Sequence, residues 1–85
     1  MALLSDNDRE ALTTEAEEKW SRVFESVGIG RQDLRAAINA VDQWVNDNRV
    51  SFNNALPQPA KANLTATQKA KLLMFVVRRR FELEA

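Results

Sequence analysis

The chain has 85 residues with 12 basic and 12 acidic side chains, so its net charge is zero and it lacks the basic excess of a general nucleic-acid binder. Histidine, cysteine and tyrosine are absent, which removes the usual general base, the thiol nucleophile and most zinc ligand sets. This length supports one hydrophobic core. We therefore expect a single non-enzymatic domain over residues 1–85, with no cofactor and no metal.

The first predicted helix begins in an acidic stretch. Ser5, Asp6 and Asp8 open the helical pattern, with the acids in the first turn, where the positive end of a helix dipole favours them. An apolar stripe then follows at helical spacing: Leu12, Ala16, Trp20, Val23, Phe24 and Val27. Thr14 and Glu17 form a capping-box pattern, so residues 1–13 are either the start of this helix or a loose arm or short helix before it.

The same acids resemble a calcium loop in their spacing. Asp6, Asp8, Glu10 and Glu17 match positions 1, 3, 5 and 12 of an EF-hand. The sixth position, which needs glycine, is Ala11, and too few residues precede the loop for an entering helix. We interpret these acids as a helix N-terminus instead.

The second predicted helix follows the Gly28-Ile29-Gly30 turn and runs from about Arg31 to Asn48. Its predicted buried positions are Leu34, Ile38, Val41 and Val45, with Ala37 and Trp44 beside them. Its predicted solvent positions are Asn39, Asp42, Gln43, Asn46 and Asp47. We expect Trp44 in the core or at its edge, not in a ligand platform.

A folded crossover is predicted next, because both prolines of residues 48–64 disfavour one long helix. One short helical turn at Ser51–Ala55 fits this stretch. Phe52 and Leu56 are expected to pin the crossover to the core, since long unstructured connections are uncommon in compact domains.

The last predicted helix, over residues 65–81, is the most strongly marked, and we predict that it is central. Thr65 and Gln68 form a capping box. The face predicted to be buried contains Leu72, Leu73, Val76 and Val77, with Phe81 one turn below. A buried β-strand is the alternative, but the cap and the Lys/Gln/Ala/Leu run favour a helix. Residues 82–85 are expected to fray.

These elements predict an all-α fold: a small three-helix domain with a proline-containing crossover between helices two and three. The central apolar run is far shorter than the ~20 residues of a membrane span. The opening residues predict neither a signal peptide nor an anchor. We expect a soluble cytoplasmic product with no membrane contact.

Charge is unevenly distributed. Residues 1–28 carry seven acids and three bases, whereas residues 61–85 carry two acids and six bases. This asymmetry indicates pairing of the first and last helices, within one chain or head-to-tail between copies. The basic cluster of Arg78, Arg79 and Arg80 with Lys69 and Lys71 has three interpretations: a solvated helix end that pairs with the acids, a protein-docking surface, or a nucleic-acid site.

The candidate interaction residues are the charged and aromatic side chains of the first and last helices. They are Glu17, Glu18, Trp20, Phe24, Lys71, Phe75, Arg78, Arg79, Arg80 and Phe81. The charges would guide association, and the aromatic residues would supply affinity if they lie outside the core.

Three stretches of sequence carry a resemblance to a known group of proteins. They read D-L-R-A-A-I-N-A-V-D-Q-W-V, S-F-N-N-A-L-P and L-T-A-T-Q-K-A-K-L-L-M-F-V-V-R-R-R. With the M-A-L-L-S-D-N-D-R-E opening, they resemble small proteins encoded in the structural modules of tailed bacteriophages and related prophages. The similarity spans Ala2 to Phe81. Gly30 departs from it, because a Thr or Ser cap is expected there.

The resemblance implies a virion component or assembly factor, near the head or the head-to-tail junction. Such a protein would be present in many copies, bound to phage structural proteins or to copies of itself. It would occupy the host cytoplasm during assembly and then the virion. The shared motifs are packing, loop and cap residues, so no catalytic residue is implied. The alternative is a small nucleic-acid-binding or regulatory protein that uses the basic last helix.

Overall fold

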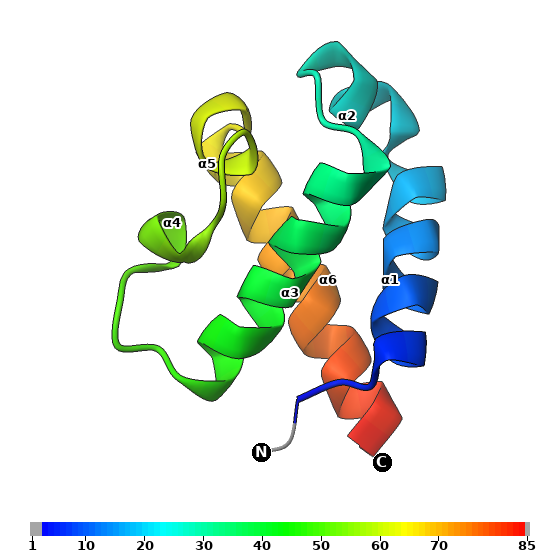
Figure 1. The fold of residues 1–85 in the computed structure, drawn as a ribbon, viewed down its shortest axis with the longest axis vertical. Coiled ribbons are helices and arrows are strands. Elements are labelled where there is room, and N and C mark those ends of the chain that lie inside the picture. Colours follow the sequence, from blue (N-terminus) through cyan, green and yellow to red (C-terminus); the bar gives the residue numbers. More distant parts are fainter. Residues whose placement is uncertain (1–2, 85) are drawn as a thin grey trace.

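The computed structural model describes residues 3–84, and within them every regular element is an α-helix (Figure 1). The six helices are α1 (Asp6–Lys19), α2 (Ser21–Ser26), α3 (Arg31–Asn46), α4 (Phe52–Ala55), α5 (Ala60–Asn63) and α6 (Ala66–Glu84). The predicted all-α class is confirmed. The three-helix description is not confirmed in detail, because three short helices accompany the three long ones.

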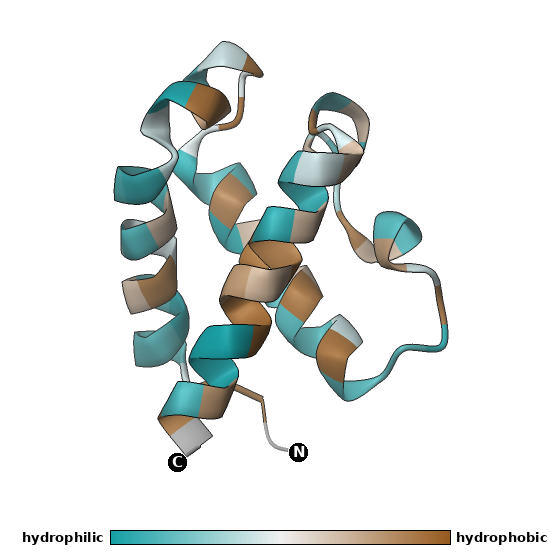
Figure 2. Cartoon of the chain, turned by 180° about the vertical axis from the view of Figure 1, so that it is seen from behind, coloured by the Kyte–Doolittle hydropathy of each residue, from teal (hydrophilic) through white to brown (hydrophobic). Residues whose placement is uncertain are grey.

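The central helix is α3, not the last helix as predicted. It packs against α1, α4, α5 and α6, and in Figure 1 it lies between α1 and the α4–α5 segment, with α6 behind it. Its residues Leu34, Ala37, Ile38 and Val41 are buried, as expected from their spacing. Figure 2 shows α6 from the other side, with a hydrophobic middle between hydrophilic stretches. That middle supplies Leu72, Phe75 and Val76 to the same core, among other residues.

The helix ends follow from local capping. The backbone N–H of Asp8 donates to Ser5 Oγ at 3.1 Å, so α1 starts at Asp6 and continues through Thr14. The alternative start near Glu15 is wrong; Met1 and Ala2 lie outside the described residues. At α6, the Gln68 N–H donates to Thr65 Oγ1 at 3.1 Å, and the Thr65 N–H donates to Gln68 Oε1 at 2.9 Å. The predicted capping box is confirmed. The helix extends to Glu84, so residues 82–84, which we expected to fray, are helical.

Gly28 ends α2 in a left-handed conformation, with φ of +73°. Its N–H donates to Glu25 O at 3.2 Å, and the Ile29 N–H donates to Phe24 O at 2.8 Å. This is the Schellman pattern, which favours glycine because a side chain would strain the turn. Ile29 and Phe24 are both buried, so the turn also delivers apolar surface to the core.

Trp20 interrupts the single helix that we predicted over the first apolar stripe. Its backbone, with φ of −125° and ψ of 31°, separates α1 from α2. The break coincides with an aromatic cluster, in which the Trp20 ring lies edge-on to Phe24 and Phe75, with centroid distances of 6.2 and 5.3 Å. Such edge-to-face pairs contribute about 0.5–1.5 kcal/mol beyond their buried area. The packing of the Trp20 ring therefore outweighs the tendency of this stretch to form one continuous helix.

The crossover packs on the core through Phe52 and Leu56, as predicted. It contains two short helices, α4 and α5, where one was predicted. The short turn at Ser51–Ala55 is α4, and Leu56 after it is buried. Phe52 packs edge-on to Trp44 at 5.4 Å, and both rings are partly buried. Trp44 therefore lies at the core edge, as expected. The helix α5 was not predicted, because the prolines beside it suggested irregular structure.

Asp42 and Arg80 form a buried ion pair that the sequence analysis placed in water. Asp42 is 0% exposed and Arg80 is 1% exposed. The Arg80 guanidinium donates to Asp42 Oδ1 and, at 3.0 Å, to the Asp42 carbonyl oxygen. The other carboxylate oxygen accepts the Leu4 N–H at 3.1 Å. Asp42 therefore joins the segment before α1 to the last turns of α6.

The spacing of the core residues explains the burial of this pair. Arg80 continues the line of Leu72 and Val76 at steps of four, and Asp42 lies four residues after Ile38. Burying two charges is tolerated when they pair and their remaining sites are hydrogen-bonded. The predictions of a water-facing Asp42 and a surface Arg80 are therefore wrong.

Core truncation tests the arrangement of α3. Ile38→Ala should reduce the free energy of unfolding by about 2–5 kcal/mol, because Ile38 is fully buried between helices. Gln43→Ala, on the exposed side of the same helix, should change it little. Urea unfolding followed by circular dichroism measures both. Equal losses would contradict the assignment of helix faces.

The ion pair has its own test. Arg80→Met should cost about 3–5 kcal/mol, because it leaves the Asp42 carboxylate buried without its cation. Adding Asp42→Leu should restore part of that loss by removing the stranded charge. Arg49→Met is the control, since Arg49 pairs with Asp47 at the surface and its loss should be nearly silent. A double variant less stable than Arg80→Met would argue against this account.

Candidate functional site

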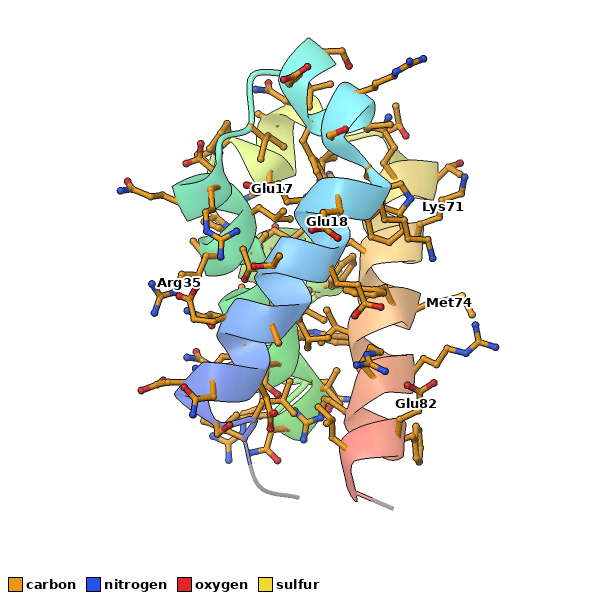
Figure 3. All side chains as sticks on the ribbon, turned by 90° about the vertical axis from the view of Figure 1, so that its right-hand side faces the viewer. Glu17, Glu18, Arg35, Lys71, Met74 and Glu82 are labelled. Carbon is orange, nitrogen blue, oxygen red and sulfur yellow. The ribbon has the colours of Figure 1, made fainter. Side chains whose placement is uncertain are left out.

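A groove of about 670 Å³ lies between α1 and α6. Its lining residues are Glu15, Lys19, Trp20, Lys71, Met74, Phe75, Arg78, Arg79 and Glu82. Figure 3 shows this side of the molecule, with Lys71, Met74 and Glu82 along α6 and Glu18 on the neighbouring α1. The groove exists because α1 and α6 each pack mainly on α3. We call it the α1–α6 groove.

The floor of the groove is aromatic. Trp20 is half-buried and lies edge-on to Phe75, which is 9% exposed. The Lys19 ammonium lies 5.0 Å from the Trp20 ring centroid and 5.8 Å from that of Phe75. Cation–π attraction of this kind occupies Lys19 within the chain. Beside this floor, Met74 is 70% exposed and offers apolar surface to a partner.

A second, smaller hollow adjoins the α1–α6 groove beside Trp20 and Lys71. It measures about 110 Å³ and is lined by Trp20, Val23, Phe24, Gln68, Lys71 and Leu72. Because both hollows share Trp20 and Lys71, the apolar surface continues from the α1–α6 groove toward α2.

The cations at the rim differ in their partners. Arg79 lies 3.3 Å from a Glu15 carboxylate oxygen and also pairs with Glu82, so it spans the groove from α6 to α1. Lys71 and Arg78 are exposed and form no ion pair with the described residues. These two cations remain available to an outside anion.

The other side of α1 is already neutralised by α3. Arg31 lies 3.1 Å from a Glu10 carboxylate oxygen and 3.4 Å from one of Glu17, and Arg35 lies 2.7 Å from Glu10. In Figure 3, Arg35 lies on the side of α1 away from α6. The acidic first helix therefore pairs with both neighbouring helices, whereas the sequence suggested pairing with the last helix.

The structure brings together five of the ten predicted interaction residues. Trp20, Lys71, Phe75, Arg78 and Arg79 all line the α1–α6 groove.

The other five predicted residues do not line the groove. Phe24 is 7% exposed and belongs to the core, Glu17 pairs toward α3, and Glu18 lies on the exposed face of α1. Arg80 is buried with Asp42. Phe81, predicted on the buried face, is 65% exposed because Arg80 occupies the inward position one residue earlier.

Sequence reasoning missed Met74 as a groove residue. The signal was available, because Met74 lies two residues after Leu72 and two before Val76, on the opposite side of α6. An exposed methionine between buried residues is a candidate contact, since its flexible side chain adapts to partners. Lys19, Glu15 and Glu82 were also missed, because the groove depends on how α1 lies beside α6.

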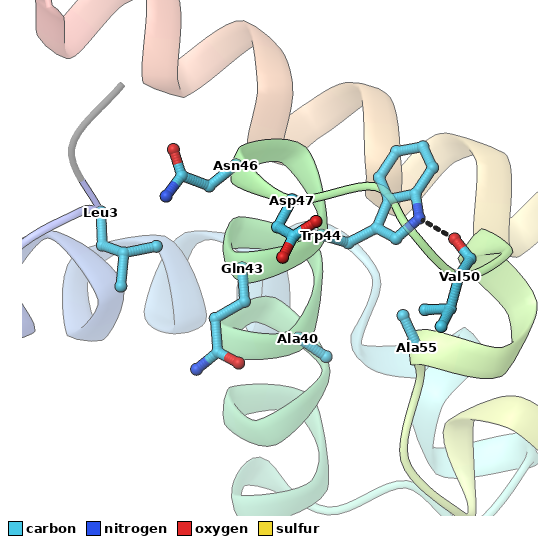
Figure 4. A pocket seen from close by; sticks show the side chains of 8 residues that line it. All are labelled: Leu3, Ala40, Gln43, Trp44, Asn46, Asp47, Val50 and Ala55. Carbon is cyan, nitrogen blue, oxygen red and sulfur yellow. Dashed lines mark hydrogen bonds between the residues drawn. The ribbon is translucent and has the colours of Figure 1, made fainter.

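A further hollow of about 420 Å³ lies beside α3 and the α4 segment (Figure 4). Its lining residues are Leu3, Ala40, Gln43, Trp44, Asn46, Asp47, Val50 and Ala55. The Trp44 indole N–H donates to the Val50 carbonyl oxygen at 2.7 Å, which ties the loop after α3 to that helix. Trp44 thus has a structural role at this hollow.

The polar groups of the α1–α6 groove are ammonium, guanidinium and carboxylate groups, which suit charge recognition. Among the side chains that the structure describes, those of residues 3–83, no three metal-ligating groups gather at one place. Over the same residues, no helix combines the length and hydropathy of a bilayer span. The chain matches no protein-family model, no curated protein and no solved structure.

Stability measurements separate groove residues that are free to bind from those that hold the fold. Lys71→Ala combined with Arg78→Ala should change the free energy of unfolding by less than about 0.5 kcal/mol, because both side chains are exposed and unpaired among the described residues. Trp20→Ala should cost about 2–3 kcal/mol through lost ring packing. Thermal and urea unfolding measure both. A large loss in the double variant would mean that these cations hold the fold.

Proposed function

We propose that this protein is a non-enzymatic structural or assembly protein of a tailed-phage particle, acting by protein–protein docking at the head or the head-to-tail junction. It is present in many copies, first in the host cytoplasm and then in the virion. The observation that carries the docking role is the α1–α6 groove, where exposed Met74 lies beside an aromatic floor and beside Lys71 and Arg78, which form no ion pair with the described residues. Apolar anchors flanked by charges are typical of protein-binding surfaces.

The phage setting is supported by the sequence resemblance alone. The stretches that resemble phage structural-module proteins form α3, the crossover and α6. They include the Thr65–Gln68 cap and the core residue Ile38, which specify the fold. Docking through the groove is compatible with attachment to a larger phage protein or to another copy of this chain.

The arrangement of the arginine cluster favours protein docking over nucleic-acid binding. Arg80 is in the interior with Asp42, and Arg79 pairs with Glu15 and Glu82. Arg78 and Lys71 remain at the surface beside apolar Met74. Phosphate backbones are bound by several outward-facing cations, and the run of three arginines presents fewer of them than its sequence suggests.

Incorporation into particles tests the proposal. We expect mass spectrometry of purified particles, made by cells that carry this gene, to detect the protein in many copies. Lys71→Glu with Arg78→Glu should reduce incorporation at least fivefold, because it reverses the charge at the groove. Arg22→Glu with Arg49→Glu is the matched control, since both arginines are exposed outside the groove. Particles that lack the wild-type protein would refute the phage role, and normal incorporation of the groove variant would refute docking through this surface.

A further inference from the structure

We propose that the α1–α6 groove binds an acidic amphipathic helix of another protein, which places one large apolar side chain between two carboxylates seven residues apart. This inference rests on the proposed docking function and specifies the partner. It follows from the apolar surface, the spacing of the cations and the poor match of this chain to itself.

The outward face of α6 offers exposed apolar surface to a partner. Met74 and Phe81 are 70% and 65% exposed, and they lie seven residues apart on one side of the helix. Met74 borders the aromatic floor formed by Trp20 and Phe75. A large side chain from a partner would contact this floor and Met74 together, and apolar contact at the centre of a groove supplies most of the affinity in such interfaces.

The charged side chains of the groove indicate the sign and the spacing of the charges that a partner would carry. Four cations and two carboxylates line the groove, which gives a net charge of +2 (4 − 2). Arg79 pairs with both carboxylates, and Lys19 lies over the rings. Lys71 and Arg78 remain, seven residues and about 10 Å apart along α6. Carboxylates seven residues apart on a helix alongside α6 would meet both.

Another copy of this chain is a poorer occupant than a separate acidic helix. The outer face of α1 does carry acids seven residues apart, the partly buried Asp8 and the exposed Glu15. The residue between them on that face is Ala11, whose single methyl group buries little apolar surface. Glu15 is also already paired with Arg79. The charges of α1 therefore match those of the groove, but α1 has no large apolar side chain between them.

Fluorescence titration tests this proposal with the full chain. Trp44→Phe leaves Trp20, in the groove floor, as the one tryptophan reporter. The probe is a synthetic helical peptide with glutamates seven residues apart and a leucine midway. We expect saturable binding with a Kd below about 1 mM. Replacing its leucine by alanine, or its glutamates by lysines, should weaken binding roughly tenfold.

Variants of the protein test whether the peptide binds in the α1–α6 groove. Met74→Ala, and Lys71→Ala with Arg78→Ala, should each weaken binding roughly tenfold, whereas Arg49→Ala should leave it unchanged. Equal binding of the lysine peptide, or of the alanine peptide, would overturn the proposal. So would a concentration-dependent dimer in sedimentation that Met74→Ala abolishes, because the occupant would then be a second copy. Tighter, salt-steep binding of a DNA duplex at the same residues would overturn it in favour of nucleic acid.

The two proposals fail separately. Selective peptide binding by a protein that is absent from particles would remove the phage role and keep the groove specificity. Normal, groove-dependent incorporation without selectivity for the acidic peptide would keep the assembly role and remove the acidic-helix partner.

Discussion

The rest of the structure depends on the buried Asp42–Arg80 ion pair. Both side chains lie in the interior, where an unpaired charge would cost several kcal/mol, so each requires the other. Asp42 also accepts the Leu4 N–H. One carboxylate, in the C-terminal part of α3, therefore contacts both the segment before α1 and the last turns of α6. The hydrogen bonds of this pair are directional, so they add to the constraint that the packed core places on the register of α6 against α3.

That register determines what the protein presents to solvent. With Leu72, Val76 and Arg80 turned toward α3, the opposite side of α6 exposes Met74 and Phe81. Because α1 and α6 both pack mainly on α3, a groove remains between them. The candidate site is thus a consequence of how the core is arranged. Met74, Lys71 and Arg78 are exposed in it because they lie on the side of α6 that does not contribute to the core.

Much of the fold could be predicted from the sequence where the signal is local. The Thr65–Gln68 capping box and the glycine turn after α2 follow from short-range patterns, and both were found. The predicted buried line of α3 was found at Leu34, Ile38 and Val41, whereas Val45 is only partly buried. The break at Trp20 and the burial of Arg80 depend on contacts between distant helices. Charged residues were assigned to water by type, although the steps of four from Val76 and Ile38 placed Arg80 and Asp42 inward. The candidate site was predicted only in part, because the α1–α6 groove depends on how α1 lies beside α6.

Amide hydrogen exchange at Leu4 tests the central role of Asp42 most directly. Leu4 precedes α1, and its N–H has the Asp42 carboxylate as its acceptor. If this bond holds the chain across the base of the bundle, the Leu4 amide should exchange with an opening free energy close to that of global unfolding, as amides in the middle of α3 do. Exchange at the rate of an unstructured peptide, while α3 stays protected, would contradict the account.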